Sequence, residues 1–243
     1  MVLLLLLTWL QTALAVTPDQ LEPQLLAAQP FRAQRKAKGA PVLSMAQMRR
    51  TAEGAIVTGL VEVPGSTTSK AYGAAVFDLP IAVMWSAIND ETRHPGYTST
   101  AYAELLSGRP CQSGRHVLQY IEVPWVTDRW WIGIPTANTD LNRQSGGSVR
   151  ELTFRASVDP AEVKTASGQK ILGLASPIAS SQGGWFLVAI DERHTYIEYY
   201  VWTDPGGSIP GSLASTFATR GVRENLEAIH RFAKEGRPSC PIE

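Results

Sequence analysis

The sequence has little of what nucleic-acid-binding proteins need. Its 243 residues include 22 Lys plus Arg and 22 Asp plus Glu, so the formal net charge is zero. This balance excludes a protein that binds nucleic acid through a strongly basic surface, because phosphate contacts need an excess of cations. Charged residues make up 18% of the chain and hydrophobic residues 44%, which is enough apolar material for a folded core.

Signatures of catalysis and metal binding are also missing. The chain contains no Gly-x-Ser-x-Gly, no His-Glu-x-x-His and no glycine-rich phosphate-binding loop, which disfavours common hydrolases and nucleotide-dependent enzymes. Its four histidines fall in a predicted turn, strand, hairpin and helix: His94, His116, His194 and His230. We therefore predict no catalytic residue, no metal site and no cofactor.

Cysteine is scarce, with Cys111 and Cys240 only. Two thiols are too few for a four-ligand zinc site or for a disulfide-rich scaffold. In an exported protein two cysteines are usually paired, so we predict a bridge between Cys111 and Cys240 that ties the C-terminal tail to the body. Two unrelated thiols are the alternative.

Long hydrophobic runs are absent except at the N-terminus. There a leucine run at residues 3–7 is followed by Trp9, Leu10 and the small-x-small sequence Ala13-Leu14-Ala15. This pattern predicts a secretory signal peptide cleaved after Ala15, since a bilayer span needs about 20 apolar residues. The expected location is secreted or periplasmic. A retained N-terminal anchor is the alternative, because no Lys or Arg precedes the run.

The remaining chain divides into three parts by composition. Residues 16–53 are rich in Gln, Ala and Pro and form a predicted leader with a helix around residues 21–28. A domain is expected over residues 54–235, followed by a tail at residues 236–243. The leader carries a basic cluster that we interpret as a solvated face or a membrane-contact patch: Arg32, Arg35, Lys36 and Lys38.

Within the domain, β-branched and aromatic runs alternate with turn residues. They predict strands at residues 55–63, 70–77, 116–123, 129–134, 149–158, 185–190 and 195–203. A helix is predicted from residue 81, where apolar residues recur at spacings of three and four. We also expect a second short helix within residues 99–106 and an optional strand at residues 171–174.

The last segment has the clearest helical pattern. The turn at residues 204–207 precedes Ser208, a predicted N-cap, and Pro210, which suits a first helical turn. One apolar stripe follows and ends near Gly236: Leu213, Phe217, Val222, Leu226, Ile229 and Ala233. These elements predict an α+β fold in which a curved antiparallel sheet wraps around a long C-terminal helix.

Three local sequences carry a family resemblance. They lie at residues 76–90, at residues 120–131, and at residues 203–210, which read Thr-Asp-Pro-Gly-Gly-Ser-Ile-Pro. In this order and on these elements, residues 54–234 resemble the START (lipid-transfer) domains of the Bet v 1-like, SRPBCC superfamily. The resemblance implies a helix-grip fold with an apolar tunnel between the sheet and the C-terminal helix.

Alternation along the strands predicts which side chains face that helix. We expect the inward set to include Leu152 and Phe154, every second residue of 186–190 and 197–201, and every second residue of 130–134. The predicted ligand-binding residues are Trp85, Trp131, Leu152, Phe154, Phe186, Tyr199, Leu213 and Phe217. For each of them ordinary core packing is the alternative.

The resemblance and the apolar pattern together predict a protein that binds a lipid or sterol-like ligand and carries or sequesters it in the cell envelope. The expected partner is that small molecule, and the protein is expected to be a monomer. Exposed indoles at Trp125, Trp130 and Trp131 would suit a transient membrane contact, and core packing is the alternative expected for at least two of them. Two alternatives stay open. One is a polyketide cyclase or aromatase of the same superfamily, and the other is a ligand-free interaction module.

Overall fold

The computed structural model describes residues 15–124, 126–207 and 211–241, with the backbone alone at residues 211–217. Residues 1–14 of the predicted signal peptide and the predicted cap Ser208 lie outside these residues. So do the side chains of Leu213 and Phe217. No helix among the described residues has the length and apolar character needed to cross a membrane.

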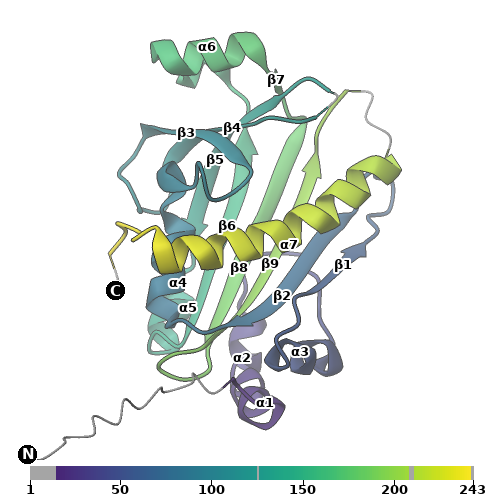
Figure 1. The fold of residues 1–243 in the computed structure, drawn as a ribbon, viewed down its shortest axis with the longest axis vertical. Helices are drawn as coiled ribbons and strands as arrows, with labels where there is room; N and C mark the ends of the chain where they lie inside the picture. The colour runs from purple at the N-terminus through teal and green to yellow at the C-terminus, as the bar shows by residue number, and fades with distance from the viewer. Residues whose placement is uncertain (1–14, 125, 208–210, 242–243) are drawn as a thin grey trace, which may run out of the picture.

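The described residues form a nine-stranded sheet in the order β1-β2-β9-β8-β6-β5-β4-β3, with β7 beside β5 (Figure 1). All pairs are antiparallel except β5 with β7. The strands are β1 (Val57–Val61), β2 (Lys70–Phe77), β3 (Thr100–Ser107), β4 (His116–Ile121), β5 (Arg129–Ala137), β6 (Val149–Ser157), β7 (Ser176–Pro177), β8 (Ser180–Ala189) and β9 (Thr195–Asp204).

Helices cover both faces of this sheet. They are α1 (Pro18–Ala27), α2 (Gln29–Arg32), α3 (Met45–Ala52), α4 (Ile81–Asn89), α5 (Thr139–Gln144), α6 (Ala166–Leu174) and α7 (Gly211–Glu235), with single 3-10 turns η1 (Glu91–Arg93) and η2 (Pro160–Glu162). In Figure 1, α7 crosses in front of the sheet, and α4 lies beneath its C-terminal end. We call this side the α7 face and the opposite side the leader face.

Helix α7 is the long helix that the sequence predicts. Its apolar stripe is buried against the sheet and α4 through Val222, Leu226, Ile229, Phe232 and Ala233. The helix ends at Glu235. At the next residue, Gly236, a Cβ atom would lie 2.0 Å from the ring of Phe232, so a residue with a side chain would clash there.

Helix α7 packs tightly on the sheet at Gly73 of β2. A Cβ atom at Gly73 would lie 2.6 Å from Cγ1 of Val222 and 2.8 Å from Cδ1 of Leu226. Because the position has no side chain, the helix can contact the strand backbone directly. α7 is thereby seated over the β1, β2 and β9 edge of the sheet.

The leader is docked on the opposite face. Helix α1 begins with a capping box between Thr17 and Gln20, which satisfies the free N–H groups of its first turn. Leu21 and Leu25 are fully buried in the same core as Tyr196 of β9. The sheet is therefore covered on both faces over β2, β9, β8 and β6.

Two short elements differ from the sequence prediction. The segment predicted as a short helix at 99–106 is strand β3, which pairs with β4 with a register shift between Leu105 and Ser107. The optional strand at 171–174 is the end of helix α6, which Thr165 caps by accepting from the N–H of Gly168. In short apolar runs periodicity alone does not distinguish helix from strand, and pairing or capping decides.

Candidate functional site

The candidate site is the surface of the sheet that faces α7. Residues paired across antiparallel strands point to the same face. The register pairs Leu152 of β6 with Trp185 of β8, and Trp185 with Tyr199 of β9. This row shares a core cluster with Val222 and Leu226 of α7, so it lies on the α7 face.

Several predicted ligand-binding residues lie on this surface. Leu152 and Tyr199 belong to the row, and Phe154 follows Leu152 on the same side of β6. Phe154 pairs with Pro135, so the alternation of β5 places Trp131 on the α7 face too. Trp85 of α4 packs into the same cluster. The structure thus brings five of the eight predicted residues to one face.

The predicted orientation of Phe186 is wrong. Phe186 packs on the leader face, together with Val188 and Ile190. Trp185 lies on the α7 face, in the place that was expected for Phe186. Both sets of alternate residues in this strand are apolar, because the leader covers the second face. Alternation therefore could not assign the faces of β8, and the sequence carries no other signal that would have identified Trp185.

The same error affects strand β5. Trp130 and Ile132 were expected to face α7, but both are buried beneath α6 in a third core cluster, with Leu118 of β4. Ile134 follows them on that side of the strand. Helix α6 was predicted as a loop with an optional strand, so the sequence offered no cover for this part of the leader face.

Aromatic rings line the α7 face in contact with one another. The rings of Trp185 and Tyr199 are stacked with centroids 4.1 Å apart, and the rings of Phe154 and Tyr199 are 6.4 Å apart. Trp185 is 6% exposed, whereas Phe154, Tyr199 and Trp131 are only half-buried. Large apolar side chains that face a covering helix without being fully buried form a surface suited to an apolar ligand.

Few polar groups interrupt this surface. Burial raises the pKa of the Tyr199 hydroxyl, and a hydrogen bond with Asn225 of α7 opposes the increase, so the phenol stays protonated. Gln119 pairs with Trp131 across β4 and β5. Arg150, two residues before Leu152, is 5% exposed, and its guanidinium carbon lies 5.7 Å from the ring centroid of Trp85. These groups can orient a polar end of a ligand.

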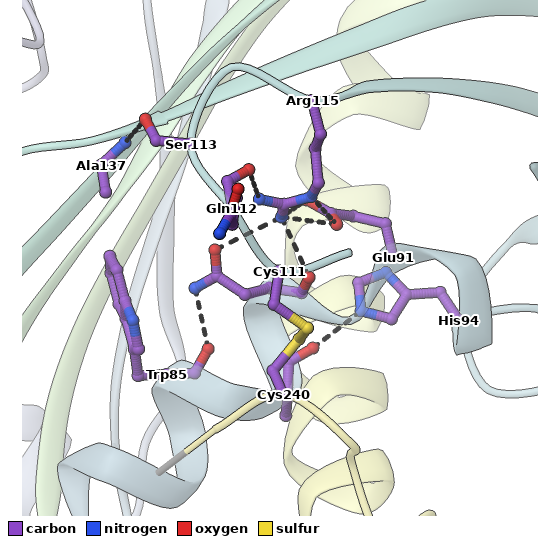
Figure 2. A network of polar contacts seen from close by, with 11 residues as sticks. Trp85, Glu91, His94, Cys111, Gln112, Ser113, Arg115, Ala137 and Cys240 are labelled. Atoms are coloured by element: carbon purple, nitrogen blue, oxygen red, sulfur yellow. Dashed lines mark hydrogen bonds and ion pairs between the residues drawn. A yellow bond between two sulfur atoms is a disulfide. The ribbon is translucent and has the colours of Figure 1, made fainter. Parts of the chain in front are cut away.

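A network of polar contacts lies near the C-terminal end of α7 (Figure 2). Arg115, which is 1% exposed, donates to the Glu91 carboxylate at 2.5 Å and to the Asn89 carbonyl at 2.9 Å. The predicted disulfide between Cys111 and Cys240 is formed. It joins the β3–β4 loop to the tail, so this end of the site is held covalently.

Hydrogen bonds add to the disulfide in fixing the tail. The Ser86 hydroxyl of α4 donates to the Cys240 carbonyl at 2.6 Å. The N–H and the hydroxyl of Ser239 donate to the Asp90 carboxylate at 2.7 and 2.9 Å. Among the described residues no group of three His, Cys, Asp or Glu side chains could hold a metal ion.

Comparison with solved structures identifies the architecture. The STAR-related lipid transfer protein of Xanthomonas axonopodis aligns with a TM-score of 0.60 and 19% identity over 74% of this chain and 94% of its own. The fold is START-like. Human StAR-related lipid transfer protein 5 aligns with a TM-score of 0.61 and 8% identity, over 90% of this chain and 98% of its own.

A third START-like structure, human STARD10, aligns with a TM-score of 0.59 and 13% identity over 85% of this chain and 79% of its own. No family model and no curated protein matches the sequence. The predicted α+β helix-grip fold is thus confirmed. At these identities the likeness concerns the fold, and the ligand has to be inferred from the site.

Proposed function

We propose that the protein binds one hydrophobic ligand, a lipid or a sterol-like molecule, between the α7 face and α7, and that it carries or sequesters this ligand. The observation that supports this most strongly is the half-buried state of Trp131, Phe154 and Tyr199 on the α7 face. Covering these side chains with an apolar ligand would contribute about 25 cal/mol per Å² of apolar surface removed from water.

The START-like fold supports a lipid as the ligand class. Two of the similar structures, from Xanthomonas axonopodis and human, carry the name of lipid transfer proteins. Gln119, Arg150 and the Tyr199 hydroxyl provide a small number of polar groups around the apolar surface. Ligand sites of this kind are mostly apolar and use a few polar groups for orientation.

The proposed place of action is the cell envelope or the exterior. The disulfide between Cys111 and Cys240 supports it, because such bonds persist in oxidising compartments. A transient membrane contact at the β4–β5 hairpin is part of the proposal, supported by the 40% exposure of Val126. Trp130 is buried and Trp131 lies on the α7 face, whereas Trp125 lies outside the described residues.

The first test is native mass spectrometry of protein purified from its own envelope fraction, followed by organic extraction. A lipid or sterol bound at one per chain, released only on denaturation, is the expected result. An unliganded mass, together with no binding of a fluorescent sterol or a fluorescent phosphatidylcholine, would contradict the proposal and favour an interaction module. Turnover of a poly-β-ketone chain would instead favour the cyclase.

A matched pair of tryptophan variants then locates the site. Trp131 is on the α7 face, and Trp202 is on the leader face, where its indole N–H donates to Thr68 at 2.9 Å. We expect Trp131→Leu to weaken binding of the fluorescent sterol about tenfold, a loss of about 1.4 kcal/mol. Trp202→Leu should leave the affinity unchanged. Equal losses in both variants would place the ligand elsewhere.

A further inference from the structure

Three neighbouring strands carry two rows of side chains, one on each face of the sheet. The register of β6, β8 and β9 places the first row on the leader face, with the residues Glu151, Phe186 and Glu198. The second row lies on the α7 face, with the residues Leu152, Trp185 and Tyr199. Each member of one row is the sequence neighbour of a member of the other. Whatever holds the first row therefore acts within one residue of the candidate ligand site.

Two leader arginines hold one end of the first row. Arg32 and Arg35 lie 2.6 and 2.5 Å from separate oxygens of the Glu198 carboxylate. The side chains are 14%, 11% and 6% exposed. The prediction that these arginines belong to a solvated or membrane-contacting face is therefore wrong. The Tyr196 hydroxyl donates to the same carboxylate at 2.8 Å, so three groups of the protein bind Glu198.

Phe186, in the middle of the row, lies beneath both arginines. The guanidinium carbon of Arg35 is 3.7 Å from the ring centroid, and that of Arg32 is 4.9 Å away. A planar guanidinium can stack on an aromatic ring and donate in its own plane at the same time, which lysine cannot do. The ring and the Glu198 carboxylate together recognise arginine.

Glu151 holds the end of the leader segment. Its carboxylate accepts the backbone N–H groups of Lys36 and Ala37 at 2.9 and 3.0 Å. It also accepts the Asn138 side-chain amide at 2.7 Å. Residues 32–37 are thus bound at both ends by carboxylates of the sheet, although two of the four basic residues in the cluster, Lys36 and Lys38, are exposed.

The buried charges of the two leader arginines and of Glu198 compensate one another. Burial alone would raise the pKa of Glu198, but Arg35 and Arg32 lower it below the usual value. Removing one side of a buried ion pair leaves an uncompensated charge, which is strongly unfavourable. The strand would then have to shift, or water would have to enter, next to Tyr199.

We propose that residues 32–37 are a positioning segment for the ligand site, in which Arg32 and Arg35 hold Glu198 and Phe186 and thereby set the positions of Tyr199 and Trp185 on the other face. This inference rests on the proposed function. The coupling is mechanical, because a closely packed sheet transmits a displacement to adjacent residues. The leader would then control how long a ligand stays bound, although the leader itself does not contact the ligand.

The experiment compares full-length variants labelled with 5-fluorotryptophan. The test variant is Arg32→Gln with Arg35→Gln, and the conservative variant is Arg35→Lys. Arg143→Gln removes an exposed ion pair with Asp140, whose partners are 77% and 61% exposed. Val163→Ala truncates a buried residue of the third core cluster and controls for lost stability. Trp185→Phe assigns the Trp185 resonance.

Two quantities are measured: the fluorine resonance of Trp185 in ligand-free protein, and the dissociation rate of the fluorescent sterol. We expect the double variant to shift the resonance and to accelerate dissociation about tenfold. Arg35→Lys should have a smaller effect in the same direction. Arg143→Gln and Val163→Ala should change neither quantity, although Val163→Ala lowers the melting temperature.

An unmoved Trp185 resonance in the double variant would overturn the inference, as would an equal shift in Val163→Ala, which would indicate general destabilisation. If the double variant does not fold, Arg35→Lys decides by the same two criteria. If wild-type protein binds neither sterol nor phosphatidylcholine, the proposed function fails. The resonance then still decides whether the arginines position Trp185, since its measurement needs no ligand.

Discussion

The two faces of the sheet are built from the same strands but are completed differently. On the leader face the chain supplies its own cover, with Leu21 and Leu25 fully buried and with Glu198 neutralised by two arginines. On the α7 face the helix is seated at Gly73, while Phe154 and Tyr199 stay half-buried. The leader face is thus covered by the chain itself, and the α7 face retains partly exposed apolar surface, where we propose the ligand binds.

The largest expected effect concerns the disulfide, which holds the end of α7 but makes no covalent bond to the leader. The disulfide between Cys111 and Cys240 spans 129 positions, for which the chain-entropy model gives about 4 to 5 kcal/mol. We expect Cys111→Ser with Cys240→Ser to lower the free energy of unfolding by up to that amount, measured by urea denaturation. Hydrogen exchange should accelerate in the tail and the end of α7 and stay slow in α1. Equal acceleration in α1 would show that the faces unfold as one unit.

A pair of core truncations tests the division of roles between the faces. We expect Leu25→Ala to destabilise the protein by about 3 kcal/mol, because Leu25 is fully buried. Phe154→Ala should cost less than a fully buried ring would, since its ring is only half-buried, yet weaken sterol binding more than Leu25→Ala does. Denaturation and sterol titration of both variants check this. The comparison would fail if Leu25→Ala had the larger effect on affinity.

A glycine pair tests the seating of α7. A Cβ atom at Gly73 would lie 2.6 Å from Val222, whereas at Gly221 nothing lies within 4 Å. We expect Gly73→Ala to destabilise by about 1 to 3 kcal/mol through overpacking. Gly221→Ala should stabilise by about 0.5 to 1 kcal/mol through helix propensity. Thermal unfolding measures both, and a neutral Gly73→Ala would mean that α7 can move away from β2 without cost.

The smallest expected effect is the contribution of Glu198, on the leader face, to the pH dependence of stability. The pKa of Glu198 in the folded protein lies below its usual value of 4.5, so the unfolded chain takes up a proton first. The stabilisation is present above pH 4.5 and is lost as the pH falls through the folded-state pKa. Urea midpoints should fall on acidification less steeply in Glu198→Gln than in wild type. Identical slopes would contradict a role for Glu198.

Much of the fold follows from local pattern. The helix from Gly211 to Glu235, the strand at residues 70–77 and the pairing of two cysteines all appear as predicted. Helix α5 between β5 and β6 and strand β3 were missed. Both are short, and their state depends on neighbours: Asn138 caps α5 by accepting from the N–H of Leu141, and β3 exists through its pairing with β4.

Only part of the candidate site could be predicted from the sequence. Alternation placed Leu152, Phe154 and Tyr199 correctly, because the other side of those strands carries polar residues such as Glu151 and Glu198. It failed for Phe186, where both neighbours are apolar. The leader arginines were also misassigned. A basic residue in a polar segment looks the same in sequence whether it is solvated or paired with a distant buried carboxylate.

By itself the sequence determined most of the strands, the apolar stripe of α7, the glycine that follows its end, and the two thiols that could pair. These are properties of single residues and of their spacing along the chain. Only the tertiary structure decided which face of β8 meets α7, that Arg32 and Arg35 are buried, and that aromatic rings remain half-covered beside α7. Those features depend on which distant segments cover each face, and burial is a property of the assembled core.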